Sequence, residues 1–182
     1  SPHIIARGIS RTFQNIRLFS QLTVLENVQI AQYHHTAYSL WDAVLRLKRF
    51  RSAERRLKQE AFEFLAYLGL EKFISEKAKN LPYGLQRRLE IARALASHPK
   101  LLLLDEPAAG MNPQEIGALM MDIKKMQKDY SLTIILIEHQ MQLVMGICDR
   151  IKVLDFGETI AEGSPDQIRR HPLVLTAYLG ED

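Results

Sequence analysis

The sequence has few of the features that mark disulfide-rich, membrane-spanning or nucleic-acid-binding proteins. Its one cysteine, Cys148, excludes an internal disulfide framework. The longest aliphatic runs, Leu101 to Leu104 and Ile134 to Ile137, are far shorter than the roughly 20 apolar residues of a membrane-spanning helix. The net charge is only +3, from 24 basic and 21 acidic residues, which does not by itself indicate a nucleic-acid partner.

The composition is that of a folded globular protein. Hydrophobic residues make up 47% and charged residues 25% of the 182 residues, which excludes a disordered chain. A chain of this length can form one domain with a sizeable core. Because the chain begins with Ser1 rather than methionine, and no secretory leader follows, we expect it to be processed or truncated.

Helix signals dominate residues 21 to 80. Thr23 and Glu26 have the spacing of a capping box ahead of an apolar stripe, which predicts a helix that begins at residue 24. Residues 53–68 carry a second apolar face at helical spacing, and Gly69 is suited to end that helix.

Strand signals appear after residue 81 and alternate with helix signals. Three apolar runs predict strands buried on both faces: Leu101 to Leu104, Leu132 to Ile137 and Ile151 to Phe156. Asn112 and the proline after it are typical of a helix start. This order predicts an α/β protein with a mostly parallel sheet and a helical insertion.

Two adjacent carboxylates follow the first of these strands. At the carboxyl end of the strand, Asp105 could hold a magnesium ion, and Glu106 could deprotonate an attacking water molecule. The alternative is that both acids simply begin a solvated loop.

Three further residues are ambiguous when each is considered alone. Gly84 near a helix start could let a phosphate approach free backbone N–H groups, although on its own a plain turn before a helix with a basic first turn fits better. His139, just after the strand at Leu132 to Ile137, could contact a terminal phosphate or the attacking water, but single histidines are common on surfaces. Gln14 has no distinguishing context of its own.

The order of these residues along the chain resembles the ATP-binding subunits of ABC transporters. The resemblance implies that Gln14 is the Q-loop glutamine, which contacts the metal and the nucleotide, and that His139 is the catalytic switch histidine. It implies that Leu101 to Glu106 is the Walker B strand, in which Asp105 binds metal and nucleotide and Glu106 is catalytic. It also implies that Pro82 to Gln86 is the signature loop and Ala108 to Asn112 the D-loop, and that these loops bind nucleotide through Tyr83, Gly84, Gln86 and Asn112.

Longer stretches are similar to importers of branched-chain amino acids and related amides. They read RTFQNIRLF, LPYGLQRRLEIARAL, LLLLDEPAAGMNP, IEHQMQLVMGICDRIKVLDFGETIAEGSP and AYLGED. The resemblance implies an ABC-type P-loop ATPase core with a helical subdomain. It divides the chain into residues 1–14 (core and Q-loop), 15–97 (helical subdomain with the signature helix) and 98–182 (core with a short tail).

The resemblance also implies a function. It indicates the ATPase subunit of an ABC importer, with ATP and Mg²⁺ as ligands, working as a homodimer or heterodimer. The expected partners are transmembrane permease subunits and, indirectly, a periplasmic or extracellular substrate-binding protein. The expected location is the cytoplasmic side of the cell membrane. No glycine is followed by lysine, so the chain has no G-x-x-x-x-G-K-[ST] phosphate loop, and we expect it to begin after that segment and to be weak or inactive alone.

Two other functions remain open from the sequence. One is a soluble ABC-type ATPase acting on ribosomes or DNA, and the other is a non-catalytic interaction fragment. The basic stretch from Arg46 to Lys58 could contact RNA, but without interleaved aromatic residues it better fits a solvated helix face or an edge facing anionic lipid, so we expect no nucleic acid.

The sequence between Gln14 and Gly84 is the predicted permease-docking surface. It carries aromatic residues outside a clean core stripe, among them Tyr38 and Trp41. The alternative is that these two aromatic side chains pack inside the helical insertion.

Overall fold

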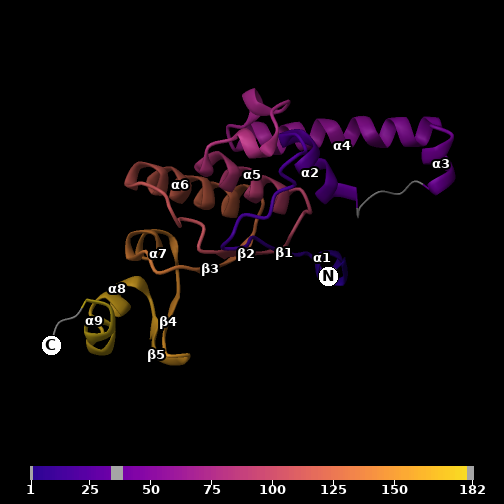
Figure 1. The fold of residues 1–182 in the computed structure, drawn as a ribbon. Coiled ribbons are helices and arrows are strands. Elements are labelled where there is room, and N and C mark those ends of the chain that lie inside the picture. The colour runs from indigo at the N-terminus through magenta and orange to yellow at the C-terminus, as the bar shows by residue number, and fades with distance from the viewer. Residues whose placement is uncertain (1, 34–38, 180–182) are drawn as a thin grey trace.

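The computed structural model describes residues 2–33 and 39–179, in which the longer helices lie on one side of a short central sheet (Figure 1). The α-helices are α1 (Pro2–Ala6), α2 (Val24–Gln32), α3 (Leu40–Val44), α4 (Lys48–Tyr67), α5 (Tyr83–Leu95), α6 (Pro113–Asp129), α7 (Met141–Ile147), α8 (Pro165–Arg169) and α9 (Pro172–Leu179). Two 3₁₀ turns, η2 (Glu71–Phe73) and η3 (Ala78–Asn80), lie between α4 and α5.

The central sheet is parallel, as the alternation of strands and helices predicts. Its order is β1 (Ile9–Arg11), β2 (Leu101–Asp105) and β3 (Thr133–Ile137), and Leu101 pairs with both Ile9 and Thr133. The helices from α2 to α5 connect β1 to β2, and α6 connects β2 to β3. The carboxyl ends of all three strands therefore lie at one edge of the sheet.

The predicted helix starts are confirmed. The Thr23 hydroxyl accepts the backbone N–H of Glu26, whose carboxylate in turn accepts the N–H of Thr23 at 2.7 Å. Asn112 caps α6 in the same way with Glu115. α4 begins at Lys48, earlier than the predicted residue 53, and the chain leaves it through Gly69, whose φ of +71° favours glycine.

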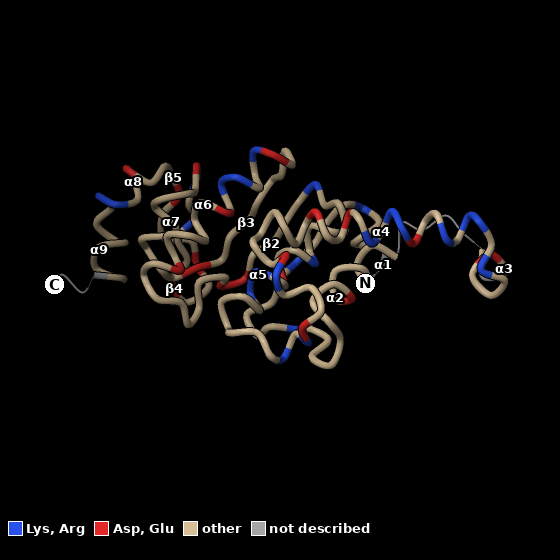
Figure 2. Tube along the Cα trace, turned by 90° about the horizontal axis from the view of Figure 1, so that it is seen from above, with Lys and Arg blue, Asp and Glu red and all other residues tan. Residues whose placement is uncertain are grey.

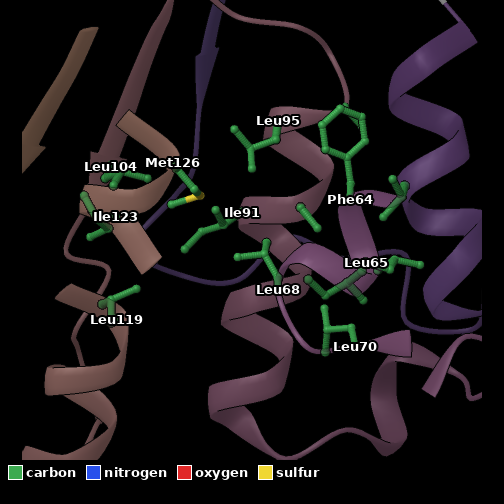
Figure 3. Close-up of a cluster of buried hydrophobic side chains, with 14 of the residues drawn as sticks. Phe64, Leu65, Leu68, Leu70, Ile91, Leu95, Leu104, Leu119, Ile123 and Met126 are labelled. Atoms are coloured by element: carbon green, nitrogen blue, oxygen red, sulfur yellow. The ribbon is translucent and has the colours of Figure 1, made fainter. Parts of the chain in front are cut away.

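One hydrophobic core joins the sheet to the helices on one of its faces (Figure 3). β2 contributes Leu102 and Leu104, which are buried against side chains of α4, α5 and α6. Side chains that Figure 3 draws in this core include Phe64, Leu65, Leu68, Leu70, Ile91, Leu95, Leu104, Leu119, Ile123 and Met126. The helical segment is thus packed on the same core as the strands.

The prediction that β3 is buried on both faces is wrong. Ile135 and Ile137 are 51% and 57% exposed, whereas Ile134 and Leu136 pack against the core. Successive side chains of a strand point to opposite faces of the sheet. Because α5 and α6 lie on the same face of the sheet in Figure 1, they cover Ile134 and Leu136 and leave Ile135 and Ile137 exposed on the other face. In β2, likewise, Leu101 and Leu103 are only partly buried.

The third predicted strand is present, and residues 159–161 pair back on it across Gly157 as the sequence indicates, but its burial and its place in the sheet differ from expectation. β4 (Ile151–Asp155) does not join the parallel sheet but pairs antiparallel with β5 (Glu158–Gly163) across a turn at Gly157. This hairpin packs one face on Ile168 and Val174 of α8 and α9, so Leu154 on its other face is 51% exposed. A half-covered hairpin therefore replaces the expected buried strand.

α4 extends away from the body and carries α3 at its far end, in both Figure 1 and Figure 2. Trp41 on α3 is 73% exposed, so the alternative that it packs inside the insertion is wrong. Tyr38 lies outside the described residues.

Of the helices that the structure describes, none is both long and apolar enough to span a bilayer. The division of the chain at residues 14 and 97 stays a prediction.

Candidate functional site

Three of the predicted site residues meet at the carboxyl edge of the sheet. Gln14, Glu106 and His139 follow β1, β2 and β3 respectively. The Gln14 Nε2 donates to Glu106 Oε2 at 2.6 Å, and His139 Nδ1 lies 3.7 Å from Glu106 Oε1. A carboxylate between an amide and an imidazole can accept a proton from a water molecule that the other two groups orient.

The backbone presents Glu106 at this point through a tight turn. Its φ of +43° lies in the left-handed region, which costs a non-glycine residue about 1–3 kcal/mol. Its backbone N–H donates to the carbonyl of Ile137 at 2.9 Å, which ties the turn to the end of β3. The Glu106 side chain keeps 25% exposure, so water can reach its carboxylate.

Asp105 lies beside this cluster with its own partner. Its Oδ2 is 2.6 Å from the Nη2 of Arg11, a side chain that is half exposed on β1. Its backbone N–H donates to the Thr12 hydroxyl at 3.3 Å. The pair with Arg11 balances the charge that this carboxylate brings to the sheet edge.

The side chains at this edge include oxygen donors of the kind that Mg²⁺ uses. Asp105 and Gln14 supply carboxylate and amide oxygens, and magnesium is commonly held by one or two carboxylates together with substrate phosphates and water. Within residues 2–33 and 39–179, no three His, Cys, Asp or Glu side chains gather into a complete metal site. The metal role of Asp105 and Gln14 stays a prediction.

Sequence reasoning missed the role of Glu138. Its carboxylate is fully buried and accepts the backbone N–H groups of Ala108 at 2.9 Å, His139 at 3.0 Å and Gln140 at 3.2 Å. Glu138 thus fixes the loop that carries His139 to the loop that follows Glu106. The only sequence signal was a glutamate at the end of an apolar strand, which is more often solvated.

The predicted signature residues form a second group, on α5. A Cβ added at Gly84 would lie 3.1 Å from Glu115 Oε1, and a Cβ at Gly110 would lie 3.4 Å from the Tyr83 ring. Tyr83 and Gly84 therefore pack against the loop from residue 110 to the start of α6, which includes Asn112. They belong to the first turn of α5 rather than to the turn before it.

Two predicted nucleotide-binding side chains are engaged in their own turns. Gln86 Nε2 donates to the carbonyl of Leu81 at 2.8 Å. The Asn112 side chain caps α6. Their contact with nucleotide, like the catalytic and metal roles of the other residues, stays a prediction.

A buried ion pair connects the two groups. Arg87 and Glu90, with side chains 0% and 1% exposed, are 2.7 Å apart on α5. Arg87 also donates to the carbonyls of Phe13 and Gln14, both at 2.7 Å, and to the Tyr83 hydroxyl at 3.3 Å. The loop that carries Gln14 is therefore fixed to the helix that carries Tyr83 and Gly84. Nothing in the Arg-x-x-Glu spacing distinguished this pair from an exposed one.

Comparison with known protein families gives two matches. A sequence profile described as "ABC transporter" matches residues 2–109. A second profile, described as "Branched-chain amino acid ATP-binding cassette transporter", matches residues 158–182.

Individual relatives are similar over nearly the whole chain. It is 45% identical over 180 residues to the high-affinity branched-chain amino acid transport ATP-binding protein BraF of Pseudomonas aeruginosa, covering 98% of this chain and 71% of the relative. It is 47% identical over 178 residues to LivG of Escherichia coli, which has the same description, covering 97% and 70%. A crystal structure of an ATP-binding cassette of an ABC transporter in its ADP conformation superimposes with a TM-score of 0.79 at 29% identity, covering 99% of this chain and 71% of the other.

Proposed function

Because this chain belongs to the ABC transporter ATP-binding family, we propose that it is the ATP-hydrolysing subunit of an importer of branched-chain amino acids. The observation that carries the proposal is the meeting of Gln14, Glu106 and His139 at one edge of the parallel sheet. The relatives do not favour the two alternatives, a soluble ATPase acting on ribosomes or DNA and a non-catalytic interaction fragment.

Glu106 is the proposed general base. Its carboxylate would take a proton from the water that attacks the terminal phosphate, while His139 and the Gln14 amide hold that water in line. The hydrogen bond from Gln14 keeps the Glu106 carboxylate oriented, and the N–H of Glu106 bonded to Ile137 keeps the turn fixed. The side chains are thus arranged before the nucleotide arrives.

Asp105 and Gln14 would hold Mg²⁺, which when bound would neutralise charge on the phosphates. Arg11 pairs with Oδ2 of Asp105, so Asp105 could serve the metal through Oδ1 while this ion pair stays in place. Residues 1–182 contain no lysine-bearing phosphate loop, so phosphate binding by this chain alone depends on the sheet edge.

The second group of residues would serve a nucleotide bound to a second ATPase subunit. Gly84 and Tyr83 are at the start of a helix of 13 residues, where free N–H groups and the helix dipole favour an anion. Asn112 lies beside Tyr83 and Gly84 and would face the same nucleotide. Two subunits would thus enclose ATP at their interface, as a homodimer or a heterodimer.

When two ATPase subunits close around ATP, the movement would be transmitted to the permease subunits. The helical segment between Gln14 and Gly84 is the proposed docking surface, because Arg87 on α5, the helix that begins where this segment ends, donates to the carbonyls of Phe13 and Gln14, where the segment begins. The location would be the cytoplasmic side of the cell membrane, with a periplasmic or extracellular binding protein delivering the amino acid.

Glu106→Gln in the full-length gene product tests the catalytic assignment. The amide keeps the shape but loses the base, so hydrolysis should fall by about 10²–10⁴-fold while ATP binding remains. Glu158→Gln, the same change at an exposed position of the β4–β5 hairpin, is the matched control and should keep normal turnover. Near-normal hydrolysis by Glu106→Gln would contradict the assignment.

A further inference from the structure

The far end of α4 exposes a group of large apolar side chains. Trp41, Val44, Leu45 and Leu47 are 73%, 65%, 63% and 45% exposed, and neither hydrophobic core of the described residues includes them. All four come from α3 and the turn that joins it to α4, which we name the tip (residues 39–47). Single exposed apolar residues are normal, but a contiguous group on a protruding element marks a contact surface.

The tip lies next to the most basic part of the chain. Residues 39–58 hold seven basic and two acidic residues, a net charge of +5, whereas the whole chain carries +3. The rest of the chain is therefore slightly acidic, and the positive charge is concentrated here, as the Lys and Arg positions along α4 show in Figure 2. All seven basic side chains are exposed: Arg46, Lys48, Arg49, Arg51, Arg55, Arg56 and Lys58.

The two acids of this segment do not neutralise it. Asp42 is engaged by Ser39, whose backbone N–H and hydroxyl donate to its carboxylate at 2.9 Å. Glu54 accepts the Tyr33 hydroxyl at 3.4 Å. The charge of Asp42 also acts on Arg49, but two acids against seven basic residues leave a net charge of +5 next to the exposed apolar group.

We propose that the tip and the first turns of α4 bind the surface of an anionic lipid bilayer. The apolar side chains would enter the boundary between headgroups and acyl chains, and the arginines and lysines would contact lipid phosphates. Tryptophan favours this boundary because its ring is apolar and its N–H is polar. The proposal goes beyond ATP hydrolysis and does not depend on it. Within the segment proposed above for permease docking, it assigns the protruding tip and the first turns of α4 to the bilayer and leaves the rest of the segment to the permease.

Other partners explain only half of these observations. RNA or an acidic protein would be attracted by the charge, but neither accounts for four exposed apolar side chains at the end of a protruding helix. A bilayer accounts for both, since it offers an apolar layer directly beneath a layer of negative charge.

Binding to vesicles tests the proposal directly. The chain is mixed, without nucleotide, with vesicles of phosphatidylcholine alone or of phosphatidylcholine with phosphatidylglycerol, and bound protein is measured by sedimentation. Binding should require phosphatidylglycerol and weaken as salt is added. Trp41 is the only tryptophan of the 182 residues, so its fluorescence should shift to shorter wavelength when the tip enters the bilayer.

Matched variants locate the contact. Each basic residue near an anionic surface changes binding by about fivefold, so Arg49→Gln with Arg51→Gln should weaken it by about 25-fold. Lys124→Gln with Lys128→Gln removes the same charge from exposed positions on α6, across the body in Figure 1, and should have little effect. Leu45→Ser should weaken binding by about tenfold, whereas Leu173→Ser on α9, 56% exposed, should not.

Three results would overturn the proposal. The first is no binding to phosphatidylglycerol vesicles, and the second is equal loss in the tip and control variants. The third is binding to RNA or to an acidic protein that depends on Arg49 and Arg51 but not on Leu45, which would assign the charge to another partner. Each can occur while ATP hydrolysis is normal, so failure here is distinguishable from failure of the proposed function.

Discussion

Replacing Arg87 with methionine removes the cation that fixes the loop of Gln14 to α5. Methionine keeps much of the side-chain volume, so the main change is loss of charge and hydrogen bonds. The Glu90 carboxylate, 1% exposed, would lose its ion-pair partner, and Arg93 would be the remaining cation whose charge acts on it. The carbonyls of Phe13 and Gln14 would each lose a donor at 2.7 Å.

The magnitude follows from burial. Removing one partner of a buried ion pair typically destabilises a protein by about 3–5 kcal/mol, because an uncompensated charge stays inside. The Nε–H of Arg87 has no hydrogen-bond partner among the described residues, which makes the intact pair less favourable. We therefore expect the lower end of that range, about 3 kcal/mol.

The neighbouring arginine supplies the control. Arg88 is 30% exposed and lies 3.4 Å from Asp122, so Arg88→Met should destabilise the protein by less than about 1 kcal/mol. The two variants make the same chemical change one residue apart on one helix. Urea unfolding followed by circular dichroism would measure both.

A double variant separates the ion pair from other effects. Arg87→Met combined with Glu90→Leu leaves neither charge buried alone, so its destabilisation should be clearly smaller than the sum of the two single effects. Equal destabilisation by Arg87→Met and Arg88→Met, or a strictly additive double variant, would refute the reasoning.

Three other predictions concern hydrolysis, a buried acid and a helix cap. The 182-residue chain has no lysine-bearing phosphate loop and should hydrolyse ATP very slowly; turnover equal to that of a polypeptide carrying such a loop ahead of residue 1 would contradict the assignment. Burial raises the pKa of Asp122 above 3.8 despite Arg88 and Lys125, so folding favours its protonated form and stability falls as pH rises through that pKa. Asp122→Asn should therefore stabilise the protein slightly at neutral pH, and this gain should vanish in urea titrations below pH 3.8. Thr23→Ala should lower the free energy of unfolding by about 1 kcal/mol in the same titrations, because it removes the cap of α2; an unchanged midpoint would contradict that role.

Local signals explain why much of the fold could be predicted. The caps at Thr23 and Asn112 involve residues three positions apart, so a short stretch of sequence contains all the information. The apolar runs of β2 and β3 likewise indicate strands regardless of their surroundings. The adjacent Asp105 and Glu106 at the end of an apolar run pointed to the sheet edge where the structure places them.

Features that depend on distant contacts could not be predicted. The runs of β3 and β4 do not reveal that one face is uncovered, because that depends on where the helices pack. The roles of Arg87 and Glu138 depend on backbone groups brought to them by folding, and their local sequence resembles that of exposed charged residues. The same limit applies to Gln86, whose turn toward Leu81 is set by the start of α5.

Uptake of branched-chain amino acids by cells tests the central claim most directly. Cells from which the gene has been deleted would receive the full-length gene, the Glu106→Gln gene or the Glu158→Gln gene, and uptake of labelled leucine, isoleucine and valine would be measured. The account predicts that deletion abolishes high-affinity uptake, that the wild-type and Glu158→Gln genes restore it, and that the Glu106→Gln gene does not, although its product is present in equal amount. Uptake that survives the deletion, or that the Glu106→Gln gene restores, would contradict the account.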